Sequence, residues 1–203
     1  MDNNLQTVCM QEAKPSRTNR ERTEATRQAL LDAARALFVS KGYNDTSTPD
    51  ICAWTETTRG ALYHHFADKR DLFRHVLLRE AEAVTADILA ATPDGLAPRA
   101  ALIAGSQAYL DAMTVPGRTR LLLIDGPAVL GRAEMQAMDE ANAADTLREG
   151  LLAAIPGAGK VSMDALSGLL SAAFDRAALD IDGGADAAEV RAALLWLLGK
   201  MLD

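Results

Sequence analysis

Cysteine, aromatic residues and long apolar stretches are all scarce in this chain of 203 residues. The two cysteines, Cys9 and Cys52, cannot form a disulfide framework, and the first residues lack the charged-then-apolar pattern of a secretory signal. The longest stretch without a charged residue, 100–110, is far shorter than the roughly 20 residues of a membrane-spanning helix. We therefore expect a soluble protein of the reducing cytoplasm that does not enter a membrane.

Runs of β-branched residues, which favour strands, are also rare, and the chain beyond residue 75 is built largely from Ala and Leu. These two residues have high helix propensity. With 49% apolar and 24% charged residues, the chain has the composition of a folded globular protein. The sequence therefore predicts an all-α fold.

Charge is distributed unevenly along the chain, whose formal net value is −7. Residues 14–79 contain twelve Lys and Arg against eight Asp and Glu, whereas from residue 80 onward acidic residues outnumber basic ones about two to one. Six of the nine aromatic residues also lie in the first 75 positions. This pattern predicts a basic N-terminal module attached to an acidic, aliphatic C-terminal region, and a basic module is typical of nucleic-acid binding.

Apolar spacing and capping residues predict four helices in the first 91 residues. The first ends at Lys41 and Gly42, where the cation lies at the negative end of the helix dipole and glycine permits a left-handed cap. Thr46 or Ser47 caps the second helix. Two short helices joined by a tight turn after a longer helix form a helix-turn-helix. The predicted ranges are about 22–41, 47–54, 59–65 and 69–91.

The C-terminal region predicts five more helices, which brings the total to about nine. The last helix is apolar on nearly every side and therefore needs burial on two sides. One side can pack on its own subunit and the other on a second copy of the chain, which gives a four-helix interface with two-fold symmetry. The predicted helices are 98–113, a short one through 121–123, one from about 127 or 132 to 154, 162–180 and 186–202. The residues expected at the dimer interface are Leu166, Leu170, Phe174, Leu194, Leu195, Trp196, Leu198 and Met201.

Three consecutive segments of the N-terminal module, TSTPDI at 46–51, TRGALYHHF at 58–66 and DKRDLF at 68–73, resemble the DNA-binding domain of the TetR family of transcriptional regulators. The resemblance covers about 22–77. It implies an all-helical homodimer whose third helix enters the major groove and whose C-terminal helices bind a ligand and the partner subunit. The implied organisation is a flexible basic tail over 1–19, a helix-turn-helix domain over 20–68, and a ligand-binding and dimerisation domain over 69–203.

The resemblance also assigns contacts with double-stranded operator DNA. Hydroxyls and free N–H groups at a helix start bind phosphate, so Thr48 and Lys69 are expected to position the protein without reading the sequence. Arg59 is expected to donate a bidentate pair to guanine, and Gly60 permits close approach to base edges. The full set of expected contacts is Ser47, Thr48, Thr58, Arg59, Gly60, Tyr63, His64 and Lys69, with Arg17, Arg20 and Arg22 from the tail.

Two positions in or near the turn between the second and third helices depart from the family pattern. Glu56 occupies a position where the family commonly has glycine, and Trp54 stands where a small residue is common. A carboxylate close to phosphates would repel them. The turn and the docking on DNA are therefore expected to differ in detail.

The ligand expectation depends on the family resemblance and on small residues and methionines that leave room for a cavity. Arg120, the one arginine expected to be buried there, favours a small hydrophobic or weakly acidic ligand. Each residue taken singly fits an ordinary core equally well. The candidate lining residues are Tyr109, Met113, Arg120, Leu123, Met135, Met138 and Phe174.

Other chemistries find little support in the sequence. No metal site is expected, because neighbouring helical histidines such as His64 and His65 point apart and no acid or cysteine completes a ligand set. Cys52 is interpreted as a small core residue rather than a redox sensor. No catalytic constellation is present, so no enzyme and no cofactor are expected. The predicted function is a repressor released from a palindromic operator when a small molecule binds; the alternative is a DNA-binding regulator without a ligand, controlled by a protein partner or by its abundance.

Overall fold

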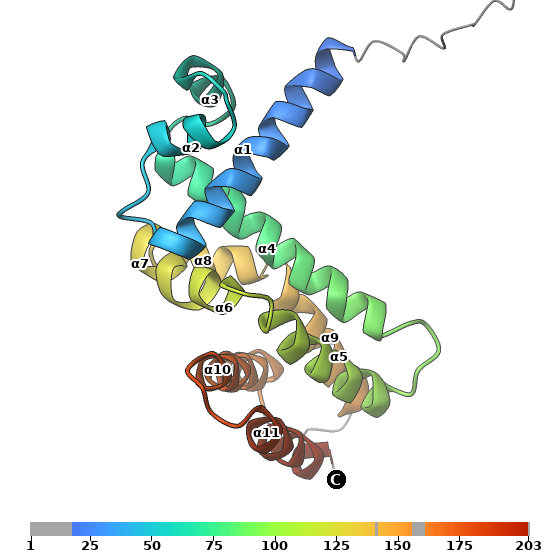
Figure 1. Cartoon of the computed structure of the whole chain (residues 1–203). Coiled ribbons are helices and arrows are strands. Elements are labelled where there is room, and N and C mark those ends of the chain that lie inside the picture. Colours follow the sequence, from blue (N-terminus) through green and yellow to red (C-terminus); the bar gives the residue numbers. More distant parts are fainter. Residues whose placement is uncertain (1–17, 141, 156–160, 203) are drawn as a thin grey trace, which may run out of the picture.

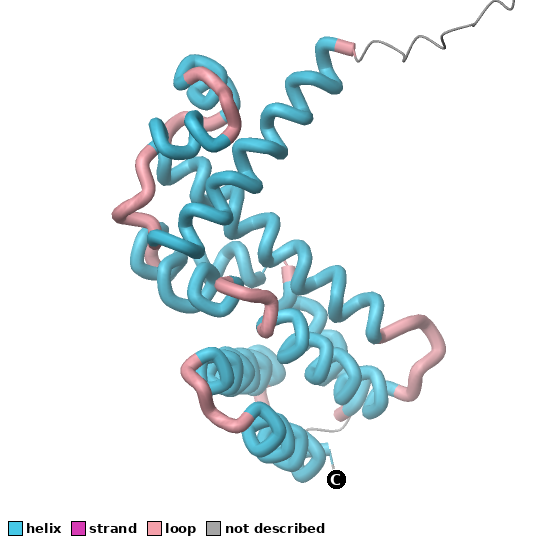
Figure 2. The backbone as a smooth tube through the Cα atoms, in the orientation of Figure 1, coloured by secondary structure: helices cyan, strands magenta, loops and turns pink. Residues whose placement is uncertain are grey.

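The computed structural model describes residues 18–140, 142–155 and 161–202, and within these ranges every regular element is helical (Figures 1 and 2). The all-α prediction is confirmed. No helix in the described part of the chain is long and apolar enough to cross a membrane. Residues 1–17, which include most of the predicted tail and Arg17, lie outside the described residues.

The four N-terminal helices agree closely with the predicted ranges, and a side-chain cap explains the start of each one. Thr18 and Glu21 form a capping box, which begins the first helix three residues earlier than predicted. Ser47 and Asp50 form a second capping box. Single side-chain caps come from Thr58, before the third helix, and Asp68, before the fourth. The helices are α1 (Asn19–Lys41), α2 (Thr48–Trp54), α3 (Arg59–His65) and α4 (Lys69–Ala91).

A dense aromatic core holds these helices together. Phe38 of α1 meets Phe73 of α4 edge to face, with ring centroids 5.0 Å apart. Phe66, directly after α3, is also fully enclosed. Cys52 is 6% exposed within the same core, as predicted for a small core residue. Each of the short helices α2 and α3 is thus fixed against α1 and α4 rather than by its own hydrogen bonds alone.

The C-terminal region contains more breaks than the sequence predicts. The helix expected from about 127 or 132 to 154 is divided into three, because Gly131 adopts a left-handed φ of 87° after the first piece and the chain leaves helical geometry again at Asn142. The elements are α5 (Pro98–Met113), α6 (Arg118–Arg120), a π-helical turn η1 (Leu121–Asp125), α7 (Gly126–Leu130), α8 (Arg132–Glu140), α9 (Ala143–Ala154), α10 (Met163–Asp182) and α11 (Ala187–Leu202).

Helix α4 runs from the N-terminal helices along the C-terminal region, so it belongs to both (Figure 1). Its Glu80, 5% exposed, lies between Arg35 of α1 and Arg118 of α6. The Arg35 Nε donates to Glu80 Oε1 at 2.7 Å and the Arg118 Nε donates to Oε2 at 2.9 Å. Burial alone would raise the pKa of Glu80, but the two guanidinium groups outweigh it and hold the pKa below its usual value. This triad joins three helices through one carboxylate.

A second cluster ties α8 to the beginning of α4. Arg70 and Arg74 of α4 both donate to the carboxylate of Glu134 on α8, with Arg70 Nη2 at 2.8 Å from Oε2. Arg70 also donates to the carbonyl of Leu130, at the end of α7. Any displacement of α8 therefore acts directly on the end of α4 that follows the helix-turn-helix.

Candidate functional site

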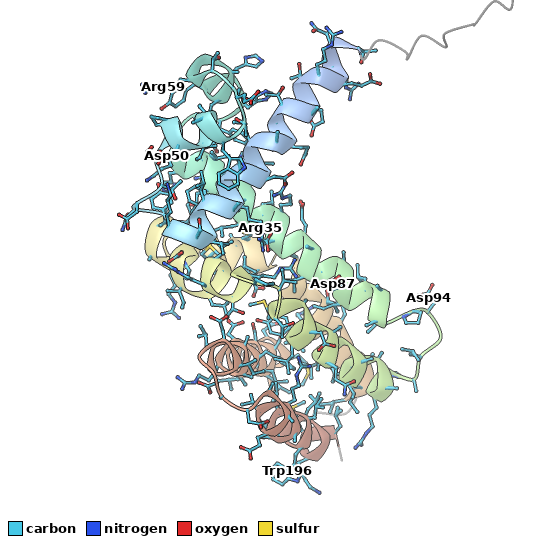
Figure 3. The ribbon with its side chains drawn as sticks, in the orientation of Figure 1. Arg35, Asp50, Arg59, Asp87, Asp94 and Trp196 are labelled. Atoms are coloured by element: carbon cyan, nitrogen blue, oxygen red, sulfur yellow. The ribbon has the colours of Figure 1, made fainter. Side chains whose placement is uncertain are left out.

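The surface of α3 that faces away from the core presents most of the residues predicted to touch DNA. Arg59, Gly60, Tyr63 and His64 are all exposed, whereas Leu62 on the opposite side is fully buried. Arg59 extends outward at the edge of the molecule (Figure 3). Helical spacing thus divides a seven-residue helix into a core face and a solvent face. The structure brings together the side chains that the sequence assigned to a common surface.

Thr48, at the start of α2, completes this surface. Its hydroxyl is 3.3 Å from the Tyr63 hydroxyl, and the Arg59 guanidinium lies 5.9 Å from the centre of the Tyr63 ring. The Thr48 hydrogen bond, followed by the charge and hydrogen bonding of Arg59, lowers the pKa of Tyr63. The exposed Tyr63 hydroxyl can donate as well as accept a hydrogen bond, so it is able to donate to a phosphate oxygen.

Lys69 has a structural role that the sequence did not reveal. Its ammonium donates to the carbonyls of Tyr43, at 2.9 Å, and Thr46, at 3.0 Å, and lies 4.2 Å from the centre of the Tyr43 ring. Since an ammonium has three N–H donors, one is left for a phosphate. Lys69 therefore fixes the connection between α1 and α2, and its contact with DNA stays a prediction.

The remaining predicted DNA contacts occupy helix ends. Ser47 and Thr58 use their hydroxyls as helix caps, accepting from the backbone N–H groups of Asp50 and Ala61. Arg20 and Arg22 are not part of a tail, since both belong to the first turns of α1.

Glu56, in the turn between α2 and α3, has a φ of 53°. This is the left-handed region that glycine occupies without strain, which explains why glycine suits the position. Glu56 therefore strains the backbone of this turn, and whether the docking on DNA differs stays a prediction.

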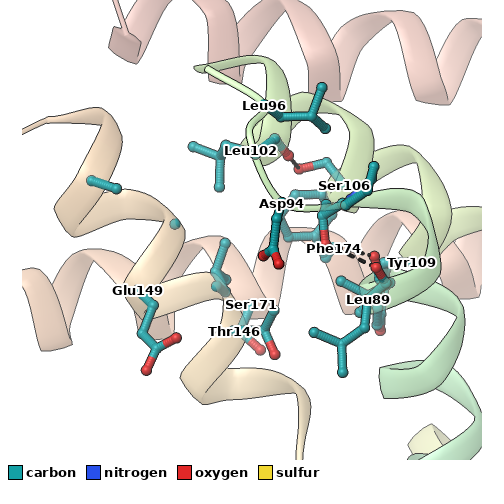
Figure 4. Close-up of a pocket in the computed structure, with 18 of the residues that line it drawn as sticks. Leu89, Asp94, Leu96, Leu102, Ser106, Tyr109, Thr146, Glu149, Ser171 and Phe174 are labelled. Atoms are coloured by element: carbon teal, nitrogen blue, oxygen red, sulfur yellow. Dashed lines mark hydrogen bonds between the residues drawn. The ribbon is translucent and has the colours of Figure 1, made fainter. Parts of the chain in front are cut away.

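A cavity of about 500 Å³ opens within the C-terminal region. The end of α4, the α4–α5 connection, α5, α8, α9 and α10 all contribute to its wall (Figure 4). Its volume falls in the usual range for small-molecule sites in proteins. Much of the wall is apolar, and Tyr109 and Phe174 form an aromatic pair in it, with ring centroids 5.7 Å apart.

Of the seven predicted lining residues, only Tyr109 and Phe174 border this cavity. Met135 and Met138 pack instead on the N-terminal core, and Leu123 packs with Met113 in a separate cluster beside α4. Met113 borders a smaller pocket. Arg120 is exposed and pairs with Asp125 at 3.3 Å, so it offers no positive charge to the cavity. The prediction failed because the region around 118–130 folds towards α1 and α4 rather than around the cavity.

Acidic residues, which the sequence analysis did not single out, line the cavity from four sides. Asp94 follows α4, Asp139 belongs to α8, Glu149 to α9 and Asp175 to α10. Asp175 accepts a hydrogen bond of 2.6 Å from the Tyr109 hydroxyl. The sequence shows an acidic excess in the C-terminal region but does not indicate which of its acids meet at this wall.

The surroundings disfavour ionisation of two of these carboxylates. Although Asp139 opens onto the cavity, the protein around it removes much of its water and, with the charges of Asp175 and Glu140, raises its pKa to about 6. Burial likewise raises the pKa of Asp175, even though the Tyr109 hydrogen bond acts in the opposite direction. For the partly buried Asp175, the shift expresses the cost of holding a negative charge in a poorly hydrated space, whereas Asp139 is exposed to solvent.

The residues predicted at the dimer interface divide into buried, partly buried and exposed groups. Leu170, Phe174, Leu194 and Leu198 are buried in the core of the same chain, so the expectation that they face a partner is wrong. Leu166 and Met201 pack partly on that core, and Leu195 is partly buried. Trp196 is 64% exposed and projects away from α11 (Figure 3). The sequence missed Leu169 and Leu197, which are 72% and 49% exposed on the same two helices.

Comparisons with known proteins match both regions of the chain. Residues 30–76 match the family model for bacterial regulatory proteins of the tetR family, and residues 99–203 match the model for the tetracyclin repressor-like C-terminal domain. The transcriptional repressor BepR of Brucella suis is 41% identical over 63 residues, which are 31% of this chain and 30% of BepR. The matched segment thus spans about three-tenths of such curated relatives.

Solved structures match over most of the chain. A TetR-family transcriptional regulator from Pectobacterium atrosepticum has a TM-score of 0.69 and 29% identity, covering 92% of this chain and 96% of its own. LfrR from Mycobacterium smegmatis, solved in complex with proflavine, has a TM-score of 0.62 and 20% identity, covering 87% and 95%. The latter shows likeness of fold alone.

Proposed function

Because the chain belongs to the TetR family of transcriptional regulators, we propose that it is a repressor that leaves a palindromic operator when a small molecule fills the C-terminal cavity. The observation that carries this proposal is the exposed face of α3, where Arg59 and Tyr63 stand beside Thr48 of α2. A helix with this face fits the major groove, with Arg59 at base edges and the hydroxyls at phosphates.

Regulators of this family bind operator DNA as dimers. We assign the interface of this chain to the outer faces of α10 and α11, where Leu169, Trp196 and Leu197 are exposed. Large apolar side chains grouped on the surface mark a site of protein association. Two-fold pairing through these helices would place two α3 helices on half-sites about 34–36 Å apart, or a multiple of this spacing.

Two features of the structure support a response to a ligand. The cavity is large enough for a small molecule, whereas a regulator without an effector would be expected to fill this space with side chains. The related fold of LfrR accommodates proflavine. The alternative, a regulator controlled only by a partner or by abundance, leaves the cavity without a role.

Helix α8 offers a direct connection between the cavity and the DNA-binding helices. Its Asp139 lines the cavity, while its Glu134, less than two turns away, binds Arg70 and Arg74 at the beginning of α4. A ligand that fits better with α8 displaced would shift this end of α4, and α3 with it. Such a ligand would lower the fraction of protein able to bind DNA. The size of this shift is limited by the difference between the ligand's affinities for the DNA-binding conformation and for the conformation with α8 displaced.

A gel mobility shift with DNA from upstream of the gene, at two salt concentrations, tests the DNA-binding part. We expect Arg59→Ala to weaken specific binding by about 1–3 kcal/mol and to relax the preference at one base pair, whereas Thr48→Ala weakens binding to all sequences alike. Arg148→Ala, which removes an exposed arginine of α9 outside both the α3 surface and the assigned dimer interface, is the control and leaves binding unchanged. An Arg59→Ala variant that keeps its preference would refute the assignment of Arg59.

Adding a panel of small molecules to the same DNA complex tests the ligand response. Release of specific DNA by one chemical class supports a ligand-controlled repressor. If specific binding persists with every compound, the alternative without a ligand gains the support instead.

A further inference from the structure

We infer that the cavity binds an organic cation, a molecule in which an amine or quaternary ammonium group is attached to an apolar body. This inference rests on the proposed function, because it names the chemical class of the effector. It is carried by the shape and the wall of the cavity, whose charged lining residues are all of one sign.

The charge of the wall comes from separate segments that converge on one space. Asp94, Asp139, Glu149 and Asp175 come from the α4–α5 connection, α8, α9 and α10 respectively. Among the described residues that line the cavity, none is Lys, Arg or His. Asp94 extends towards the interior, and Glu149 stands on another side (Figure 4). A cation in the cavity would therefore meet the partly buried carboxylate of Asp175 and the exposed carboxylates of the other three acids, and no positive side chain among the described lining residues to repel it.

The rest of the wall suits the apolar body of such a ligand. Tyr109 and Phe174 form an aromatic surface, and Leu89, Leu96 and Leu102 add aliphatic side chains. The face of an aromatic ring attracts a cation, more strongly where water is excluded. Enclosure by apolar groups with a few polar groups that fix orientation is the usual construction of a small-molecule site.

The electrostatics favour a cation over an uncharged or anionic ligand of the same shape. Asp175 is partly buried in the wall and accepts a hydrogen bond from Tyr109, and burial raises its pKa, so its negative charge is costly without a cation beside it. A cation would relieve this cost, an uncharged ligand would leave it, and an anion would increase it. The weakly acidic ligand expected from Arg120 is not supported, because Arg120 lies outside the cavity.

Direct binding of matched probes to the full-length protein at pH 7.5, measured by isothermal titration calorimetry, tests the inference. Benzyltrimethylammonium is the cation, neopentylbenzene is its uncharged isostere, and 4-tert-butylbenzoate is an anion of similar size. We expect the cation to bind at least about tenfold more tightly than the isostere and the anion to bind more weakly than both. A (2-naphthylmethyl)trimethylammonium probe extends the apolar body towards the size of the cavity.

Two variants test whether the charged group of the probe binds in this cavity. Glu149→Gln and Asp139→Asn each remove one negative charge and nearly preserve the shape of the side chain. Each should therefore weaken binding of the cation by about three- to tenfold and leave the affinity for the isostere unchanged. Glu82→Gln, an exposed acid on α4 outside the cavity, is the matched control and should change neither affinity.

The outcomes separate this inference from the proposed function. Equal binding of cation and isostere, tighter binding of the anion, cation affinities that do not respond to either cavity variant, or no saturable binding of either ammonium probe would each overturn the cation assignment. If the cations bind and the variants respond, but specific DNA is not released, the cation site stands and the ligand-controlled repression fails. If only uncharged or anionic compounds release the DNA, the repression stands and the cation site fails.

Discussion

The N-terminal and C-terminal regions of this chain are packed for different purposes. In the first, Phe38, Phe66 and Phe73 are enclosed and each helix begins with a side-chain cap. In the second, α5 and α7 begin without a side-chain cap, an open cavity of about 500 Å³ lies between the helices, and Leu169 and Trp196 remain exposed. In the proposed function, the closely packed region carries the surface that contacts DNA, and the more loosely packed region provides the ligand cavity and the dimer interface.

The difference in packing between the two regions is tested by removing one phenylalanine from each. Phe73→Ala should lower the free energy of unfolding by about 3–5 kcal/mol, because it leaves a void in a closed core. Phe174→Ala should cost about half as much, since Phe174 already borders the cavity and loses fewer contacts. Urea unfolding followed by circular dichroism, at equal protein concentration, measures both. Equal losses would show that the cavity wall is packed as tightly as the N-terminal core.

A second prediction concerns the Glu80 triad, which joins α1, α4 and α6, and how much its carboxylate contributes to the free energy of unfolding. Glu80→Gln should destabilise the chain by about 3 kcal/mol at pH 7, because the buried Arg118 loses its closer carboxylate and keeps only Asp87, at 3.6 Å, as a charged partner. In the parent chain the folded-state pKa of Glu80 lies below its ordinary value of 4.5. Its contribution is therefore complete above pH 4.5 and is lost as the pH falls through the lower folded-state pKa.

Urea titrations of both chains between pH 7 and pH 3 measure this dependence. The difference between parent and Glu80→Gln should shrink as the pH falls below 4.5. A difference that is constant over this range would show that the carboxylate charge of Glu80 is not what stabilises the triad.

The same contrast in packing explains how much of the molecule the sequence predicted. The N-terminal helices agreed within a few residues, because local signals act together there: Asp68 caps α4, and Leu62 and Phe66 mark the inner side of α3. The exposure of Arg59, Tyr63 and His64 followed from the same helical spacing. The sequence did not reveal contacts between residues far apart in the chain, such as the hydrogen bonds that the Lys69 ammonium donates to the carbonyls of Tyr43 and Thr46.

The C-terminal site was harder to predict, since its residues meet through tertiary packing that no local pattern encodes. Asp94, Asp139, Glu149 and Asp175 are far apart in the chain, and on its own each one reads as a solvated surface residue. Nearly every side of α11 is apolar, so periodicity alone could not predict which side of this helix faces the core of its own chain. Leu194 and Leu198 therefore seemed equivalent to Trp196, although only Trp196 points outward.

Two tryptophans of almost equal exposure, one in each region, allow the surfaces of the two regions to be compared. Trp196, at 64%, lies on the face assigned to the dimer, and Trp54, at 65%, lies at the end of α2. Trp196→Ser should weaken dimerisation by about tenfold or more, because large aromatic side chains dominate interface energies. Trp54→Ser should leave the dimer unchanged. Sedimentation velocity over a range of concentrations measures both, and a Trp196→Ser variant that dimerises like the parent would place the interface elsewhere.

The smallest expected effect concerns Glu56, the only non-glycine residue with a positive φ in the part of the chain that the structure describes. Glu56→Gly should raise the free energy of unfolding by about 0.5 kcal/mol, because relief of the left-handed strain slightly exceeds the extra entropy of glycine in the unfolded chain. It should also strengthen DNA binding a few-fold by removing a negative charge near α3. Glu56→Gln separates the two causes, since it removes the charge and keeps the strain: DNA affinity should rise as for glycine while stability stays at the parent value. If Glu56→Gln leaves DNA affinity unchanged and Glu56→Gly raises it, the turn conformation rather than the charge controls how α3 meets DNA.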